Sequence, residues 1–325
     1  MTGRSKILVL GATSLVGSHF VETRHGEGIT AVDIEDPRKM GMTVEEYIPL
    51  DLSREKALRD MIRKTQCDAV VNFVARTDVD GCEKERPPDV SSPAKIGGAR
   101  SAWHLNAELP GWLAQETARK GILLVHLSTD FVFDGTRGPY RENALPDPFG
   151  PLVSWYGYTK GVGESRVLSI NSKGSAVIRL SYPYRSQFVG KLDLARNLVA
   201  RHDQGKLYPL YSDQMITPTW IPDVTRAVES ILATGSTGVY HVASPVVTTP
   251  YEFAMVLFTE LGIDTEGVHS SRMDGAVVPG VAPRPHSGGL EIRGIRSLGV
   301  DPASYIEGIK MFVSEVRSKA QKAVP

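Results

Sequence analysis

The sequence predicts an α/β protein: a doubly wound parallel sheet followed by a smaller mixed α/β part at the C-terminal end. Short aliphatic runs alternate with helical stretches through the first 180 residues, and residues 7–10 form the first of these runs. Continuous aliphatic runs fit strands that are buried on both faces. Strands that alternate with helices through short connections favour a parallel sheet with helices on its faces.

Seven strands and eight helices are expected along the chain. The strands are predicted over residues 7–10, 29–34, 47–50, 69–73, 122–128, 176–180 and 239–243. The helices are predicted over residues 15–24, 54–64, 103–120, 156–169, 192–204, 222–233, 250–261 and 303–318. Proline and glycine cluster over residues 275–289 and 87–98, which predicts a loop in each place. For the loop over 87–98 two interpretations stay open, a surface insertion and a flap near an active site.

The composition excludes several classes of protein. The 37 basic and 37 acidic side chains cancel, which argues against a nucleic-acid or membrane-surface partner because both require a basic field. No apolar stretch approaches the roughly 20 residues of a membrane span. Cys67 and Cys82 form no metal-type spacing, and the eight histidines show no ligand motif, so we expect no metal site. We expect a reduced, cytoplasmic protein.

A glycine-rich turn with the sequence GATSLVG occupies residues 11–17, between the first strand and the first helix. Backbone N–H groups at the N-terminus of a helix in this place can hold a pyrophosphate. Gly11 permits the tight turn and Gly17 lets the helix pack close to the strand, while Ser14 stands where a further glycine is usual. The turn predicts a Rossmann-type dinucleotide site with these residues at the cofactor: Gly11, Thr13, Ser14, Leu15, Val16 and Gly17.

Asp33 lies at the end of the second predicted strand, about 20 residues after the turn, where a ribose-binding acid is expected. Its carboxylate would accept hydrogen bonds from the ribose and repel a 2′-phosphate, which favours NAD(H). Arg38 and Lys39 lie nearby and could accommodate that phosphate, so NADP(H) stays open. We expect residues 1–180, with part of 210–245, to form the NAD(P)-binding domain and residues 181–325 to form mainly a substrate-binding region.

Tyr156 and Lys160 are four residues apart on a predicted helix, so their side chains share one face. An ammonium near a phenol favours the phenolate, and we expect Lys160 to lower the pKa of Tyr156 toward the range of an acid/base catalyst. The fifth predicted strand ends near Thr129, at the sheet edge where open α/β folds bind ligands. A hydroxyl there could hydrogen-bond a carbonyl oxygen while Tyr156 protonates it. These three are the candidate catalytic residues.

Longer blocks narrow the assignment. The most specific is HLSTDFVFDG at residues 126–135, followed by GPY at 138–140. The others are VVN at 70–72, TDVD at 77–80, NAELPG at 106–111, DQ at 213–214, PT at 218–219, YEFA at 251–254 and RP at 284–285. With the glycine turn and the tyrosine–lysine pair, they resemble the extended short-chain dehydrogenase/reductases, and within these the dTDP-4-dehydrorhamnose reductase family. The resemblance covers nearly the whole chain.

The resemblance implies roles for individual positions. At the cofactor it places Ser14, Leu15 and Val16 on the pyrophosphate, Asp51 and Leu52 beside the adenine, and Phe73, Val74 and Ala75 after the fourth strand. It implies a catalytic triad of Thr129, Tyr156 and Lys160, with Tyr156 as the proton donor. Asn106 would support the lysine and a proton relay, or would be a helix-surface amide. The sugar would contact Asp130, Phe131 and Tyr182.

Some positions depart from the family pattern. Relatives commonly carry Tyr at the positions of Phe131 and Arg76, and Trp at the position of Tyr182. Arg76 would bring a charge near the cofactor or a substrate phosphate. Arg284 is a separate candidate for the diphosphate of the substrate, because guanidinium suits phosphate geometry.

The leading hypothesis is an NAD(P)H-dependent reductase that delivers a hydride to C4 of a nucleotide-linked 4-keto-6-deoxy sugar. A nucleotide-sugar 4-epimerase on the same scaffold is one alternative. A non-catalytic regulatory partner, such as the regulatory subunit of methionine adenosyltransferase, is another. A 4,6-dehydratase is disfavoured because Phe131 stands where elimination requires a second acid after Asp130. The oligomeric state stays open, with a homodimer as one candidate.

Overall fold

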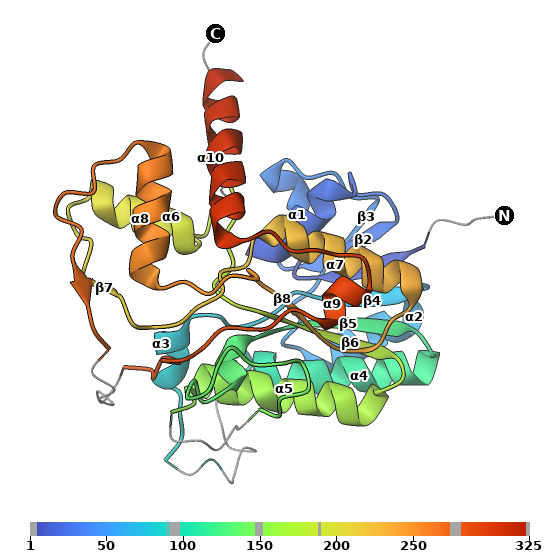
Figure 1. Ribbon diagram of the computed structural model, residues 1–325. Helices are drawn as coiled ribbons and strands as arrows, with labels where there is room; N and C mark the ends of the chain where they lie inside the picture. The colour runs from blue at the N-terminus through green and yellow to red at the C-terminus, as the bar shows by residue number, and fades with distance from the viewer. Residues whose placement is uncertain are drawn as a thin grey trace.

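The computed structural model describes residues 5–88, 90, 98–146, 152–187, 190–273 and 281–322. Within these ranges, seven strands form one parallel sheet in the order β3-β2-β1-β4-β5-β6-β8 (Figure 1). The strands are β1 (Ile7–Leu10), β2 (Ile29–Asp33), β3 (Glu46–Pro49), β4 (Ala69–Asn72), β5 (Leu123–Thr129), β6 (Ser175–Leu180) and β8 (Gly238–Val242). The order reverses between β1 and β4, the switch point of a doubly wound sheet. The predicted fold class is confirmed, and each predicted strand lies within one residue of its expected bounds.

Helices cover both faces of the sheet (Figure 1). One face carries α1 (Leu15–Thr23) and α7 (Ile221–Thr234), and the other carries α2 (Glu55–Lys64), α4 (Leu109–Lys120) and α5 (Trp155–Asn171). Along β1, Ile7 and Val9 join the apolar cluster of the first face, whereas Leu8 and Leu10 join that of the second. None of the described helices is both long and apolar enough to span a membrane.

A second, smaller region lies beside one end of the main sheet (Figure 1). It contains α6 (Leu194–Asp203), α8 (Pro250–Leu261), α10 (Tyr305–Lys322), β7 (Leu210–Tyr211) and β9 (Ser270–Ser271). The two short strands pair in parallel, and α10 packs against α8. Its apolar cluster includes Tyr184, Phe253 and Phe312 and is separate from the clusters on the sheet faces. This region is the smaller mixed α/β part that the sequence predicts.

The helix predicted over residues 103–120 is two elements in the structure. Trp103–Glu108 form a π-helical turn, η3, and α4 begins at Leu109 with Pro110 in its first turn. Pro110 has no N–H to continue the α-helical ladder, which accommodates a wider turn before it. Six short elements were not predicted because they are too short to show a hydrophobic period: the two-residue strands β7 and β9, and the helical turns η1 (Pro37–Met40), α3 (Val79–Glu83), η4 (Asp130–Val132) and α9 (Gly294–Ser297). Much of the expected loops at 87–98 and 275–289 lies outside the described residues.

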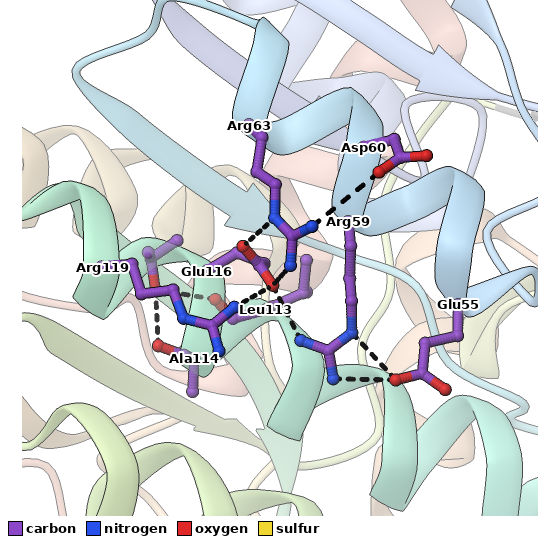
Figure 2. A network of polar contacts seen from close by, with 9 residues as sticks. Glu55, Arg59, Asp60, Arg63, Leu113, Ala114, Glu116 and Arg119 are labelled. Atoms are coloured by element: carbon purple, nitrogen blue, oxygen red, sulfur yellow. Dashed lines mark hydrogen bonds and ion pairs between the residues drawn. The ribbon is translucent and has the colours of Figure 1, made fainter.

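A network of ion pairs joins α2 to α4 on the outside of the sheet (Figure 2). The carboxylate of Glu116 is 1% exposed and accepts hydrogen bonds of 2.8 Å from Arg59, Arg63 and Arg119. Glu55 forms a second ion pair with Arg59. The hydrogen bond from Arg63 lowers the pKa of Glu116 most, and with the help of Arg59 and Arg119 it overcomes the opposing effect of burial, so that the pKa falls to about 2. These contacts stabilise the packing of α4 against α2.

Candidate active site

The glycine turn lies at the switch point of the sheet, after β1. Gly11 has a φ of +75°, a conformation that favours glycine, and a Cβ on Gly17 would overlap the carbonyl oxygen of Gly11. Ser14 caps α1: its side-chain oxygen accepts a hydrogen bond of 3.1 Å from the N–H of Gly17. The turn therefore packs closely against the start of α1. A pyrophosphate needs such close access to the N–H groups at the helix N-terminus.

Asp33 is held against this turn. One carboxylate oxygen accepts hydrogen bonds from the N–H and the hydroxyl of Thr13, at 2.9 and 2.8 Å, and the other accepts from the N–H of Ile34 at 2.8 Å. Arg38, which we considered as a phosphate partner, instead forms a two-pronged ion pair with Asp36. The Asp33 carboxylate is thus fixed at the end of β2, and the guanidinium of Arg38 is committed to another carboxylate.

A cavity of about 200 Å³ opens beside the turn. Its lining includes nine of the predicted cofactor residues: Gly11, Thr13, Ser14, Asp33, Asp51, Leu52, Phe73, Val74 and Ala75. The other predicted cofactor residues, Leu15, Val16 and Gly17 of the turn together with Tyr156 and Lys160, are not part of the lining. Four further lining residues were missed: Ile34, Ser53, Arg100 and Leu105. The first two adjoin predicted residues and could have been inferred from that, whereas no sequence signal marks Arg100 or Leu105.

Asp51 and Arg100 form an ion pair of 2.7 Å at this cavity. Burial tends to raise the pKa of Asp51, but hydrogen bonds from Arg100 and Ser53 outweigh it and lower the pKa to about 2. The Asp51 side chain therefore stays ionised. Its partner, the Arg100 side chain, is 62% exposed to solvent. Together they supply a charged rim to an otherwise largely apolar cavity.

Tyr156, Lys160 and Thr129 come together where α5 crosses the end of β5. Tyr156 is 8% exposed, and its hydroxyl is hydrogen-bonded to the Thr129 side chain. We expected Lys160 to lower the pKa of Tyr156; that expectation is wrong for this structure, because burial raises it and only the Thr129 hydrogen bond opposes the rise. The phenol therefore retains its proton at neutral pH and is suited to donate it.

Lys160 is 2% exposed and donates a hydrogen bond of 2.5 Å to the carbonyl oxygen of Leu127 in β5. Burial lowers the pKa of its ammonium to about 8, with partial compensation from Glu164, one turn further along α5. Glu164 is itself paired with Arg179 of β6 at 2.7 Å, both side chains being 2% exposed. A buried chain of charged groups thus runs from Lys160 through Glu164 to Arg179.

Asn106 is fully buried in the π-helical turn η3, so the interpretation as a helix-surface amide is wrong. Its amide oxygen accepts from the N–H of Arg76 at 2.8 Å, and its amide nitrogen donates to the carbonyl of Arg76 and to the Thr159 hydroxyl. These bonds fasten the segment after β4 to α5. The Arg76 guanidinium, for its part, pairs with Glu85 at 2.9 Å.

Two glycines of α5 allow this helix to approach its neighbours closely. A Cβ on Gly157 would overlap the carbonyl oxygen of Phe131, and a Cβ on Gly163 would overlap that of Asn106. Both contacts are with backbone atoms, which cannot move aside as a flexible side chain can. The glycines therefore set how close Tyr156 and Lys160 come to the sheet.

The predicted sugar-binding residues form an aromatic group beside Tyr156. The ring of Phe131 meets that of Tyr156 edge-on at 5.7 Å between centroids and lies 6.0 Å from that of Tyr182. Tyr182 follows β6 with a φ of 43°, unusual for a residue with a side chain, and its hydroxyl accepts a hydrogen bond from Gln214. Asp130, in contrast, is 2% exposed, and both of its oxygens are hydrogen-bonded to protein hydroxyls.

Arg284 lies near this aromatic group, with its guanidinium carbon 6.0 Å from the centre of the Phe131 ring. Its guanidinium donates to both carboxylate oxygens of Asp80 in α3, at 3.0 and 2.9 Å. A phosphate that binds Arg284 therefore has to compete with Asp80. His286, two residues further on, is 3.5 Å from Asp213 and half exposed.

Comparisons with known proteins agree with this geometry. The family described as RmlD substrate binding domain matches residues 5–318. A dTDP-4-dehydrorhamnose reductase of Mycobacterium tuberculosis is 31% identical over 315 residues, 94% of this chain and 91% of the relative. A probable low-salt glycan biosynthesis reductase of Haloferax volcanii is 30% identical over 85% of this chain and 87% of the relative.

Two further similarities bear on the fold and on alternatives. The crystal structure of dTDP-4-dehydrorhamnose reductase from Bacillus anthracis in complex with NADP superposes with a TM-score of 0.78 at 22% identity, covering 97% of this chain and 99% of that one. The methionine adenosyltransferase 2 subunit beta of Pongo abelii is 28% identical over 91% of this chain and 83% of the relative. The chain belongs to the RmlD substrate-binding-domain family and is an NAD(P)-dependent oxidoreductase of the short-chain dehydrogenase/reductase type.

Proposed function

We propose that this protein reduces the 4-keto group of a nucleotide-linked 4-keto-6-deoxy sugar, with Tyr156 as the proton donor. The observation that carries the proposal is the meeting of Thr129, a protonated Tyr156 and Lys160 at the end of β5. A hydroxyl, a phenol and an ammonium at one sheet edge suit the reduction of a carbonyl group.

The cofactor residues fit a dinucleotide. Gly11 and Gly17 leave room for close approach at the helix N-terminus, and the 200 Å³ cavity extends from there past Asp33 to Asp51. When bound, a reduced nicotinamide supplies the hydride that attacks the carbonyl carbon. Asp33 would accept hydrogen bonds from the ribose hydroxyls and exclude a 2′-phosphate, which favours NADH over NADPH.

The remaining steps belong to side chains of this protein. Thr129 donates a hydrogen bond to the carbonyl oxygen, and Tyr156 gives its proton to that oxygen as the carbon–oxygen double bond becomes a single bond. The products are the 4-hydroxy sugar, oxidised cofactor and a phenolate that regains a proton from solvent. Lys160 orients the cofactor ribose. Phe131 and Tyr182 pack against the sugar, and Arg284 exchanges Asp80 for the substrate diphosphate.

The substrate class rests on the relatives, of which one is named as a dTDP-4-dehydrorhamnose reductase and one as a glycan biosynthesis reductase. We propose that residues 181–325 supply mainly the surface for the nucleotide sugar, while part of residues 210–245 completes the sheet as α7 and β8. The position of the aromatic group between the two regions supports this division.

Oxidation of NADH and NADPH in the presence of dTDP- and UDP-linked 4-keto-6-deoxy sugars tests the proposal. We expect turnover with at least one of them and a preference for NADH. Tyr156→Phe should reduce kcat by roughly 10²- to 10⁴-fold. Tyr158→Phe is the matched control, because Tyr158 lies on the same helix and stacks on Trp155 at 5.0 Å. No turnover with any sugar of the panel would refute the proposal.

A regulatory role is the second candidate, because the β subunit of a methionine adenosyltransferase is among the relatives. It predicts that the protein co-purifies with a synthetase and changes the kinetics of that enzyme. The buried Thr129, Tyr156 and Lys160 favour the reductase, because a purely regulatory subunit does not need a polar cluster enclosed at the sheet edge.

A further inference from the structure

Asp130 is a buried acid whose surroundings do not fit direct contact with a sugar. It follows β5 in the short turn η4, and its side chain is 2% exposed. One carboxylate oxygen accepts a hydrogen bond of 2.7 Å from the Ser181 hydroxyl, and the other accepts one of 3.2 Å from the Thr129 hydroxyl. Its two oxygens thus face two hydroxyls of the protein, and one of these belongs to the candidate catalytic triad.

A threonine hydroxyl has a single proton and can donate in one direction at a time. In the structure, Thr129 directs this proton to Asp130, while its oxygen accepts from the N–H of Phe131 at 3.3 Å. That oxygen is also hydrogen-bonded to the Tyr156 hydroxyl, which acts as the donor in this arrangement. With its proton committed in this way, Thr129 has none to offer to a substrate carbonyl. If Asp130 stops accepting this hydrogen bond, the Thr129 hydroxyl becomes free to donate to another group beside Tyr156.

We propose that Asp130 is a positioning residue that controls, through its own protonation, whether the Thr129 hydroxyl points at Asp130 or at the substrate carbonyl. This inference rests on the proposed reductase function. When Asp130 is ionised, it accepts the Thr129 proton. When Asp130 carries a proton on the oxygen that faces Thr129, it becomes the donor and Thr129 becomes its acceptor. The Thr129 proton then turns toward the carbonyl oxygen, which receives two donors, Thr129 and Tyr156.

The surroundings of Asp130 make both states accessible near neutral pH. Burial raises its pKa to about 6, against the opposing effects of hydrogen bonds from Ser181, Thr129 and the local backbone. The backbone of Ser181 is held beside Asp130, because its N–H donates to the Thr219 hydroxyl at 3.0 Å and its carbonyl accepts from the N–H of Thr219. The second oxygen of Asp130 is therefore held in place while the first exchanges roles with Thr129.

The titratable groups on neighbouring elements should not change charge in the same pH range as Asp130. Burial raises the pKa of Tyr156 on α5 and of Tyr182 after β6, and it raises that of Cys82 on α3 to about 12, so all three stay neutral between pH 5 and 9. Lys160 titrates at about 8, above Asp130. From the C-terminal segment, the charge of Arg284 is paired with Asp80 and His286 lies against Asp213.

The test is the pH dependence of kcat/KM for dTDP-4-dehydrorhamnose from pH 5 to 9, in wild type and in Asp130→Asn. In wild type, kcat/KM should fall about tenfold per pH unit above roughly pH 6, before Lys160 titrates. Asparagine can donate to Thr129 and accept from Ser181, as a protonated Asp130 does. The variant should therefore lack this descending limb and equal or exceed wild type at pH 7.5.

Ser181→Ala and Asp134→Asn complete the set. Ser181→Ala removes a hydrogen bond that stabilises the carboxylate, so the limb should move to higher pH. Asp134→Asn, four residues beyond Asp130 and bonded to Tyr140 and Thr136, should leave the limb unchanged. Infrared difference spectra of wild type against Asp130→Asn provide a readout independent of turnover, since a protonated carboxyl band should titrate with the same midpoint.

Three results would overturn the inference. The first is a limb that persists in a folded Asp130→Asn variant, and the second is a folded variant that is inactive at every pH. The third, should Asp130→Asn not fold, is a limb that Ser181→Ala fails to move. In each case wild-type turnover would leave the reductase function standing, whereas absence of wild-type turnover on the whole sugar panel would remove both.

Discussion

Glu116 and Asp130 are both almost fully buried carboxyl groups, at 1% and 2% exposure, yet their pKa values shift in opposite directions. Glu116 is covered by three arginine side chains, two of which are at least half exposed, and its pKa falls to about 2. Asp130 is enclosed by the protein and meets neutral hydroxyls, and its pKa rises to about 6. Burial alone therefore does not determine the charge of an acid; the charge of its hydrogen-bond partners does.

The largest change in the free energy of unfolding is expected at a third buried acid, Glu164, whose partner is a buried arginine. Glu164 and Arg179 are both 2% exposed and joined at 2.7 Å. Arg179→Met removes the hydrogen-bonded counter-charge of the buried Glu164 and leaves only the Lys160 ammonium one turn away, and we expect a loss of about 3–5 kcal/mol in the free energy of unfolding. Urea titration of the variant measures it. The double variant Glu164→Leu, Arg179→Met should recover much of the loss; a single variant within about 1 kcal/mol of wild type would contradict the account.

The next effect concerns Asp130 and has the opposite sign. Its folded-state pKa of about 6 lies above the ordinary value of 3.8, so the folded protein binds this proton more tightly than the unfolded chain. The stability that results is complete below about pH 4 and is lost as pH rises through 6. Asp130→Asn should therefore be more stable than wild type at pH 8, by up to about 3 kcal/mol, with the gap narrowing toward pH 4. Urea titrations at pH 5 and 8 check this, and a variant less stable than wild type at pH 8 would break the comparison.

Glu116 should behave in the reverse manner. Its folded-state pKa of about 2 lies below the ordinary 4.5, so its contribution is present above pH 4.5 and is lost as pH falls toward 2. Because two of its arginine partners are largely exposed, solvent screening reduces the effect, and Glu116→Gln should cost about 1 kcal/mol at pH 7. Salt titration of the unfolding midpoint provides the control, since the difference from wild type should shrink at high ionic strength.

The smallest effect is expected at the edge of the same network. Arg119 is 62% exposed and is one of three partners of Glu116. Arg119→Ala should change the free energy of unfolding by no more than about 0.5 kcal/mol, because Arg59 and Arg63 remain. Thermal unfolding at pH 7 measures it. A loss comparable to that of Glu116→Gln would show that the network acts as a unit rather than as separate pairs.

The sequence predicted the parallel sheet well because most of its strands, β1 and β4 above all, are runs of buried aliphatic residues that end near a turn signal. Nine of the predicted cofactor residues line one cavity: four were predicted from the glycine turn and the end of the second strand, and five from the family resemblance. Thr129 and Tyr156 were brought together because one ends a strand and the other begins the next helix. Positions at strand ends are local features that a pattern can show.

The partners of charged side chains could not be predicted. Asp130 was expected at the sugar, but its carboxylate accepts a hydrogen bond from Ser181, which is 51 residues further along the chain. Arg284 pairs with Asp80 across 204 residues. The expected influence of Lys160 on Tyr156 failed because spacing on a helix does not show that the ammonium donates to Leu127 instead. Such contacts depend on tertiary packing, and residue type and spacing alone do not determine them.

The two glycines of α5 have a consequence for anyone who redesigns this enzyme. Gly157 directly follows Tyr156 and Gly163 lies three residues after Lys160, and a Cβ at either glycine would overlap a backbone carbonyl of a neighbouring segment. The position of Tyr156 and Lys160 therefore depends on the absence of a side chain at these two glycines, and not on a side chain that could be exchanged for another. A library of variants at the pocket can include Phe131 and Tyr182, but it should keep both glycines. One added methyl group at either position would clash with a backbone carbonyl and push α5 away from its neighbours.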